Sequence, residues 1–102
     1  MRRPNPLPAD YVVRHVHMDH HHGQDDYMIV AGVEGTGDVW GYLSYTTFRD
    51  IAFITYIEVK PEHRRDGVSR DLWAEFSRQN PGVRVNYGLL LPDAVPIVAA
   101  LE

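Results

Sequence analysis

The sequence predicts one α+β domain built on a mixed, largely antiparallel twisted sheet of about five strands, with a parallel strand–helix–strand crossover and a C-terminal helix. Three observations support this prediction. The chain has 102 residues, a length typical of one domain, and 44% of them are apolar. Runs of β-branched and aromatic residues fill most of the chain before Pro61. A helical spacing of apolar residues follows that proline.

The expected strands are short runs rich in β-branched and aromatic residues. Met18–Asp26 is polar and contains a glycine, so it is expected to be a loop. Glu34–Asp38 and Arg49–Asp50 are short turns that favour antiparallel pairing of the strands beside them. The five expected strands are Tyr11–His17, Tyr27–Val33, Val39–Phe48, Ile51–Val59 and Val83–Tyr87.

Two helices are expected. The first is Val68–Gln79, which Asn80-Pro81-Gly82 ends and which connects two strands by a right-handed crossover that makes them parallel. The second is Ala94–Leu101, with Asp93 as its N-cap. The apolar face of the first helix is formed by Val68, Leu72, Trp73 and Phe76.

Composition and the chain termini exclude several classes of protein. Residues 1–10 contain three prolines and are expected to form an extended arm before a single domain, 11–102. No apolar stretch follows the first arginines, and the longest apolar run, Ile97–Leu101, is too short to cross a bilayer, so a cytoplasmic protein without a membrane partner is expected. A formal charge of −4 disfavours nucleic-acid binding. The lack of cysteine excludes a disulfide scaffold, a thiolate zinc site and a cysteine nucleophile.

The segment with the clearest chemical signal leads from the fourth expected strand into the first helix. Its loop reads Arg64-Arg65-Asp66-Gly67-Val68-Ser69. The unpaired N–H groups and the dipole of a helix N-terminus attract anions, the arginines add charge, and Gly67 lets an anion approach the backbone. The loop is therefore suited to a phosphate or pyrophosphate, but charged turns of this kind are common, and a strand-to-helix turn with solvated charges is the other interpretation. It contains neither of the common glycine-rich nucleotide motifs.

The run Ile57-Glu58-Val59-Lys60-Pro61-Glu62-His63-Arg64-Arg65-Asp66-Gly67-Val68-Ser69 resembles motif A of the GNAT superfamily of N-acetyltransferases. That motif joins a strand to a helix through a loop of the form [RQ]-x-x-G-x-[GA]. Here the last position is Ser69 in place of glycine or alanine, a small change in bulk. The resemblance extends over roughly Tyr27–Leu101 and is closest over Ile57–Phe76.

The resemblance implies acetyl-CoA as the donor and a primary amine as the acceptor. It implies that the N–H groups of residues 65–69 hold the CoA pyrophosphate, with the Arg64 and Arg65 side chains in support. It also implies that the backbone of Ile57–Val59 pairs with the pantetheine arm, which lies between Val59 and the strand at Val85. An N–H near Val59 then polarises the thioester carbonyl. The implied donor-site residues are Ile57, Val59, Arg64, Arg65, Asp66, Gly67, Val68 and Ser69.

The candidate catalytic residues are Glu58 and Tyr87. Glu58 is the carboxylate within the fourth expected strand and is the candidate base, acting directly or through water, unless it is only a solvent-facing residue. Tyr87 is the nearest phenol that could protonate the departing thiolate, or else a strand aromatic. The family's two helices between its first strands, and its two last strands, have no counterpart in this chain. A second subunit that completes the acceptor side, a large substrate, and a catalytically silent CoA-binding or protein-interaction module therefore remain open, and a homodimer that covers unpaired sheet edges is expected.

Five histidines lie between His15 and His22, with Asp19, Asp25 and Asp26 nearby. Imidazoles and carboxylates in such a cluster suit Zn²⁺, Ni²⁺ or Cu²⁺, so a histidine-rich metal-binding protein on an unrelated α+β fold is a further hypothesis. The alternatives are a polar surface loop, or one histidine that acts as a base. Because no defined ligand spacing is present, no metal is expected.

Overall fold

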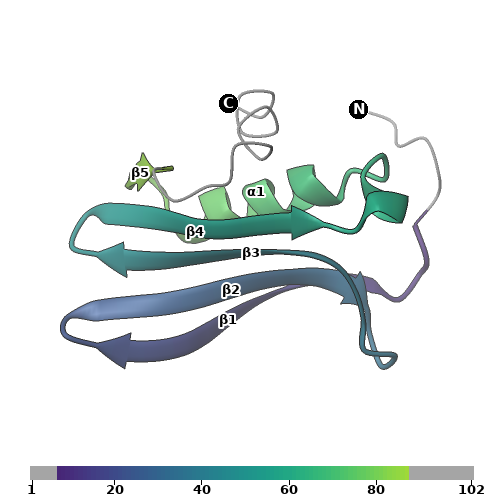
Figure 1. Cartoon of the computed structure of the whole chain (residues 1–102), viewed down its shortest axis with the longest axis horizontal. Coiled ribbons are helices and arrows are strands. Elements are labelled where there is room, and N and C mark those ends of the chain that lie inside the picture. Colours follow the sequence, from purple (N-terminus) through teal and green to yellow (C-terminus); the bar gives the residue numbers. More distant parts are fainter. Residues whose placement is uncertain (1–6, 88–102) are drawn as a thin grey trace.

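Four antiparallel strands follow one another along the chain, and a helix and a short parallel strand complete the fold. The structure is a computed structural model that describes residues 7–87 (Figure 1). The sheet has five strands in the order β1-β2-β3-β4-β5, so the predicted α+β class with a mixed sheet is confirmed. The elements are β1 (Tyr11–His21), β2 (Gln24–Val33), β3 (Asp38–Phe48), β4 (Ile51–Val59), the 3₁₀ turn η1 (Pro61–His63), α1 (Val68–Gln79) and β5 (Arg84–Asn86).

The segment between β1 and β2 differs from the prediction. Met18–Asp26 was expected to be a loop, but β1 continues to His21 and β2 begins at Gln24. Only His22 and Gly23 form the turn, with φ values of 51° and 76°. Two successive residues with positive φ make the tight hairpin turn whose twist matches that of paired strands. The polar residues therefore lie on a paired hairpin and not in a loop.

The second half of the fold matches the prediction closely. β4 and α1 have the predicted bounds, and β5 pairs in parallel with β4 at Ile51↔Arg84, Ala52↔Val85 and Phe53↔Asn86. The predicted crossover is thus confirmed. Residues 1–6 of the expected arm and the expected helix Ala94–Leu101 lie outside the described residues.

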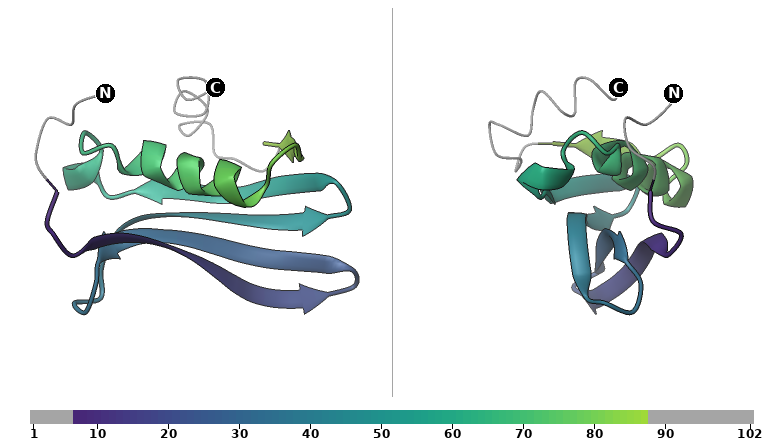
Figure 2. Two further views of the ribbon diagram at one scale, coloured as in Figure 1. Left: turned by 180° about the vertical axis from the view of Figure 1, so that it is seen from behind. Right: turned by 90° about the vertical axis from the view of Figure 1, so that its right-hand side faces the viewer.

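The core lies between α1 and one face of the sheet. The four predicted apolar residues of α1 are all buried against side chains of the strands. Fully burying an aliphatic side chain stabilises the fold by about 1.5–3 kcal/mol, so this face fixes the position of the helix. In the described residues no helix covers the other face of the sheet, which we call the open face (Figure 2). The core residues of the strands are Ile29, Ala31, Trp40, Leu43, Tyr45, Ala52, Ile54, Ile57 and Val59.

Gly41 in β3 allows the start of α1 to approach the sheet. A Cβ atom at this position would lie 2.9 Å from the Glu58 carbonyl oxygen and 3.0 Å from Cγ1 of Val68. Such distances are below normal van der Waals contact, so only glycine fits without displacement. Gly41 therefore allows the N-terminus of α1 to pack against the end of β4.

In residues 7–87 no helix is long and apolar enough to cross a membrane.

Candidate functional site

The connection between β4 and α1 is a series of tight turns. The His63 N–H donates to the Lys60 carbonyl at 2.9 Å, and the Asp66 N–H donates to the His63 carbonyl at 3.1 Å. Pro61 begins the first of these turns because it has no N–H to continue the strand pairing. Of the amides that the sequence assigned to a pyrophosphate, that of Asp66 thus already has a protein partner.

The N-terminus of α1 carries three more amides of the loop, those of residues 67–69. Gly67 is the N-cap residue, in the left-handed conformation with φ 80°, and no side chain caps the helix. The Asp71 N–H donates to the Gly67 carbonyl at 3.1 Å and begins the helical hydrogen bonding. The N–H groups of Gly67, Val68 and Ser69 precede that bond, so the helix supplies no carbonyl to them. They lie at the positive end of the helix dipole and can bind an anion.

The side chains of the loop divide into those that stabilise the turn and one that is free. The His63 ring stacks on the Trp40 indole with centroids 3.7 Å apart, and its Nδ1 lies 3.1 Å from Asp66 Oδ2. Arg64 donates from Nε to the Val59 carbonyl at 3.2 Å. Arg65 is exposed and has no ion pair within residues 7–87. Its charge is therefore available to a bound anion.

The edge of β4 beside this loop has no paired strand in the described part of the chain. Pairing with β5 ends at Phe53↔Asn86. The Lys60 N–H donates to the Trp40 carbonyl at 2.8 Å, and alternation along an antiparallel pair then turns the backbone groups of Val59 and Ile57 away from β3. Ile57 thus presents its N–H and carbonyl at the open edge, and Val59 presents its N–H, because its carbonyl accepts from Arg64.

Val85 lies opposite Ala52 and far along the strand from Val59. Within residues 7–87, β5 therefore does not extend to the position beside Val59, and only β4 bounds the expected gap there. The pantetheine position implied by the resemblance is defined by β4 alone in residues 7–87.

Glu58 and Tyr87 lie on opposite sides of the sheet. Val59 packs toward α1, so its neighbour Glu58 points to the open face, where it is exposed and 3.5 Å from the hydroxyl of Tyr42. The Tyr87 ring instead lies 5.9 Å from the Trp73 ring of α1. The structure therefore does not bring the two candidate catalytic residues together.

A pocket lies beside Glu58. It has a volume of about 330 Å³ and is lined by Val39, Trp40, Gly41, Tyr42, Glu58 and Lys60. Burial raises the pKa of Tyr42, and the nearby Tyr56 and Glu58 raise it further, so the Tyr42 hydroxyl stays protonated as a donor to Glu58. Lys60 pairs with Asp38 at 3.3 Å at the rim.

Sequence reasoning missed two parts of the site. One is the stacking of His63 on Trp40, and the other is the close approach that Gly41 permits. Neither has a spacing signal, because each joins β3 to residues that follow β4. A lone glycine inside an expected strand does indicate close backbone approach, so Gly41 itself was the signal in the sequence that could have predicted the second feature.

His15 and His17 lie on one face of β1, as the sequence predicts for alternate residues. His15 faces α1, where its Nε2 lies 2.6 Å from the Tyr45 hydroxyl and its ring stacks on Tyr27. His17 Nε2 lies 3.0 Å from Asp25 Oδ1. His20 and His21 end the strand and His22 is in the turn, so the expected loop histidines are strand residues with one exception.

Comparisons with known proteins bear on the family and the fold of the chain. A model of the acetyltransferase (GNAT) family matches residues 3–83. A solved structure described as a tandem GNAT protein from the clavulanic acid biosynthesis pathway, without AcCoA, superposes with a TM-score of 0.62 at 18% identity, over 95% of this chain and 43% of that chain. The chain thus spans less than half the length of that protein, and the likeness shows the fold alone. Comparison with curated proteins finds no significant match. Because the family model covers most of the chain and the fold agrees, the protein belongs to the GNAT acetyltransferase family.

Proposed function

We propose that the protein is an N-acetyltransferase that transfers an acetyl group from acetyl-CoA to a primary amine. Family membership supports acyl transfer from an acyl-CoA in general terms. The observation that carries the finer proposal is the junction of β4 and α1. There an uncapped helix N-terminus led by Gly67 lies beside a strand edge that presents the backbone groups of Ile57 and the N–H of Val59.

The residues of this junction fit the donor. The N–H groups of Gly67, Val68 and Ser69 bind the pyrophosphate oxygens, and the Arg65 side chain adds a positive charge. Asp66 acts through its carboxylate, which holds His63 and so fixes the turn. Arg64 donates a hydrogen bond from Nε to the Val59 carbonyl and so holds the end of β4 against the loop.

The chemistry that the coenzyme supplies is an activated thioester. The Val59 N–H lies at the open edge of β4 and stabilises negative charge on the carbonyl oxygen of that thioester. Glu58 takes a proton from the attacking amine, directly or through water, and the pocket beside it receives the acceptor. Tyr87, on the α1 side, gives a proton to the departing thiolate.

A second candidate function is a catalytically silent module that binds CoA or a protein partner. The observation that favours it is the two-residue turn between β1 and β2, which leaves the open face beside Glu58 without a covering element in residues 7–87.

A homodimer is part of the proposed acetyltransferase. A second copy of the chain seated on the open face would supply a wall for the acceptor site.

Calorimetric titration with acetyl-CoA tests the donor site. Binding should raise the free energy of unfolding by about 2.7 kcal/mol at a ligand concentration one hundred times Kd. Arg65→Glu should weaken binding strongly. Arg84→Glu is the matched control, because it makes the same charge change near Asp50 at the other end of β4. Equal affinity in both variants would refute the pyrophosphate site.

Release of free thiol with a panel of amines separates the two functions. The enzyme should release thiol with at least one amine, and Glu58→Gln should slow this release while acetyl-CoA still binds. Binding without thiol release for every amine would favour the silent module. No binding of acetyl-CoA at all would contradict both.

A further inference from the structure

The tip of the β1–β2 hairpin gathers side chains that the donor site does not use. It lies at the opposite end of the sheet from the β4–α1 junction (Figure 1). Asp19 and His21 are on β1 and Asp26 is on β2, with Asp19 paired opposite Asp26. Their ligand atoms all lie within 4.8 Å of one another. Within residues 7–87, this is the set of three possible metal ligands that meets this distance.

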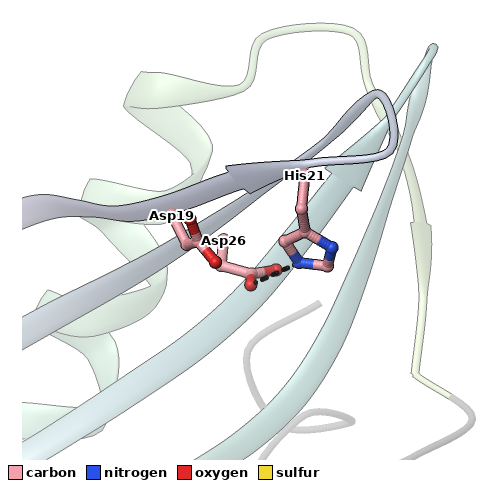
Figure 3. Close-up of side chains that lie close together, drawn as sticks. All are labelled: Asp19, His21 and Asp26. Atoms are coloured by element: carbon pink, nitrogen blue, oxygen red, sulfur yellow. Dashed lines mark hydrogen bonds and ion pairs between the residues drawn. The ribbon is translucent and has the colours of Figure 1, made fainter.

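Figure 3 shows the three side chains gathered beside the hairpin, with His21 joined to Asp26. The His21 Nε2 lies 3.0 Å from Asp26 Oδ2. Ligand atoms bound to a tetrahedral Zn²⁺ at about 2.0–2.2 Å lie roughly 3.3–3.5 Å apart. The His21–Asp26 pair is thus close to the required separation, and the Asp19 carboxylate lies within 4.8 Å of both ligand atoms.

Neighbouring groups hold both carboxylates in place. The Thr46 hydroxyl donates to Asp26 Oδ1 at 2.6 Å and leaves Oδ2 toward His21. The His20 N–H donates to Asp19 Oδ1 at 2.8 Å. Hydrogen bonds from outside a metal site orient its ligands in this way. Because all three ligands are on paired strands beside a two-residue turn, the backbone of the site is already ordered.

The chemistry of the set indicates the class of ion. Two carboxylates carry the negative charge that a divalent cation needs, and an imidazole favours a transition metal over Mg²⁺ or Ca²⁺. His21 and Asp26 keep 42% and 35% of their side chains exposed, which leaves room for water at the remaining coordination positions.

We infer that Asp19, His21 and Asp26 bind one divalent first-row transition-metal ion at the hairpin tip, with Zn²⁺ as the ion that best suits the set. The ion joins β1 to β2 across their turn. The inference does not rest on the proposed acetyl transfer, because the site and the donor loop share no residue.

The opposite face of the same hairpin offers a matched control. His20 Nδ1 and His17 Nε2 lie 2.7 and 3.0 Å from one oxygen of Asp25, and strand alternation places this trio away from the proposed site. His20→Ala removes an exposed imidazole but keeps the N–H that holds Asp19. It therefore distinguishes the proposed site from general binding by exposed histidines.

The test is calorimetric titration of the untagged, metal-free full chain with Zn²⁺. The wild type should bind one ion, and Asp26→Asn, Asp19→Asn and His21→Ala should each weaken binding at least about tenfold. Asp26→Asn retains an oxygen for Thr46, and circular dichroism checks that each variant folds. In nuclear magnetic resonance spectra of the wild type, Zn²⁺ should shift the His21 ring signals most.

Affinity unchanged in His20→Ala, together with these losses, supports the site. Equal weakening by His20→Ala and Asp26→Asn would overturn it in favour of nonspecific histidine binding. The absence of binding up to about 1 mM Zn²⁺ would overturn it outright. None of these outcomes depends on acetyl-CoA, so failure here is distinguishable from failure of the proposed function.

Discussion

The ring of His63 lies flat on the indole of Trp40, with centroids 3.7 Å apart and planes inclined by 4°. Trp40 belongs to β3 and is only 8% exposed, whereas His63 ends the turn that leads into the candidate donor loop. The stack therefore fixes a surface turn to the core of the sheet.

His63→Ala should lower both the free energy of unfolding, by about 1 kcal/mol, and the affinity for acetyl-CoA, because the turn loses its stacking partner and its link to Asp66. Urea unfolding and calorimetry measure the two effects. His63→Phe keeps the stack but not the bond to Asp66, so it separates them. Affinity that does not change in His63→Ala would show that the stack has no part in holding the donor loop.

Ser69→Ala should keep acetyl-CoA binding and raise stability slightly. The Ser69 hydroxyl oxygen is buried without a hydrogen-bond partner, and leaving such a group unpaired costs about 1–3 kcal/mol. The proposed anion contact uses the Ser69 N–H, which alanine retains. Thermal unfolding and calorimetry check both expectations, and weaker acetyl-CoA binding in this variant would implicate the hydroxyl itself.

Gly41→Ala should destabilise the fold by about 1–3 kcal/mol, because the added methyl group would overlap the Glu58 carbonyl and the Val68 side chain. Gly35→Ala is the control for an added Cβ alone: no atom lies within 4 Å of that position, although its φ of 82° adds backbone strain. Urea unfolding compares the two. A smaller loss for Gly41→Ala than for Gly35→Ala would mean that the start of α1 adjusts freely.

Stability should fall as the pH is lowered below about 6.5 through the titration of His15. Burial lowers the pKa of His15 below its usual 6.5, the charges of Arg78 and His17 lower it further, and Glu75 opposes them. The Tyr45 hydroxyl accepts from Asn80 at 3.0 Å and lies 2.6 Å from His15 Nε2, a position from which it can donate to the neutral ring. The unfolded chain then binds a proton at higher pH than the folded chain.

The contribution of neutral His15 to the free energy of unfolding is fully present above the pKa that His15 has in the unfolded chain. It is lost as the pH falls toward the lower pKa of the folded chain. Unfolding in urea at several pH values measures it. His15→Gln cannot titrate, so its stability should change less between pH 6.5 and the folded pKa than that of the wild type. Parallel pH dependences for the two proteins would exclude His15 as the origin.

Prediction from sequence was most accurate where local signals agreed with tertiary packing. The bounds of β4 and α1 follow from an apolar run that Pro61 stops and a helical spacing that Asn80-Pro81-Gly82 ends. The loop between them was predicted to suit an anion from its residues alone. A helix N-terminus next to arginines and a glycine attracts anions in any fold. The family model later supported the resemblance.

The same reasoning failed at residues 18–26 because local polarity indicates exposure and not conformation. Strand pairing depends on a partner, and β2 is paired with β3 along most of its length, which gives β1 a template. The turn needed only His22 and Gly23 in positive φ. Side chains that were expected in a loop thus face one another across a hairpin, which is how Asp19, His21 and Asp26 come together.

The sequence by itself determined the order of the described elements and the chemical character of the candidate donor loop, residues 64–69, because both depend on neighbours along the chain. The tertiary structure alone decided which side chains meet. It placed Glu58 and Tyr87 on opposite faces and stacked His63 on Trp40. These relations follow from strand register and from the face that α1 covers, and a residue's own neighbours in the sequence carry no information about either.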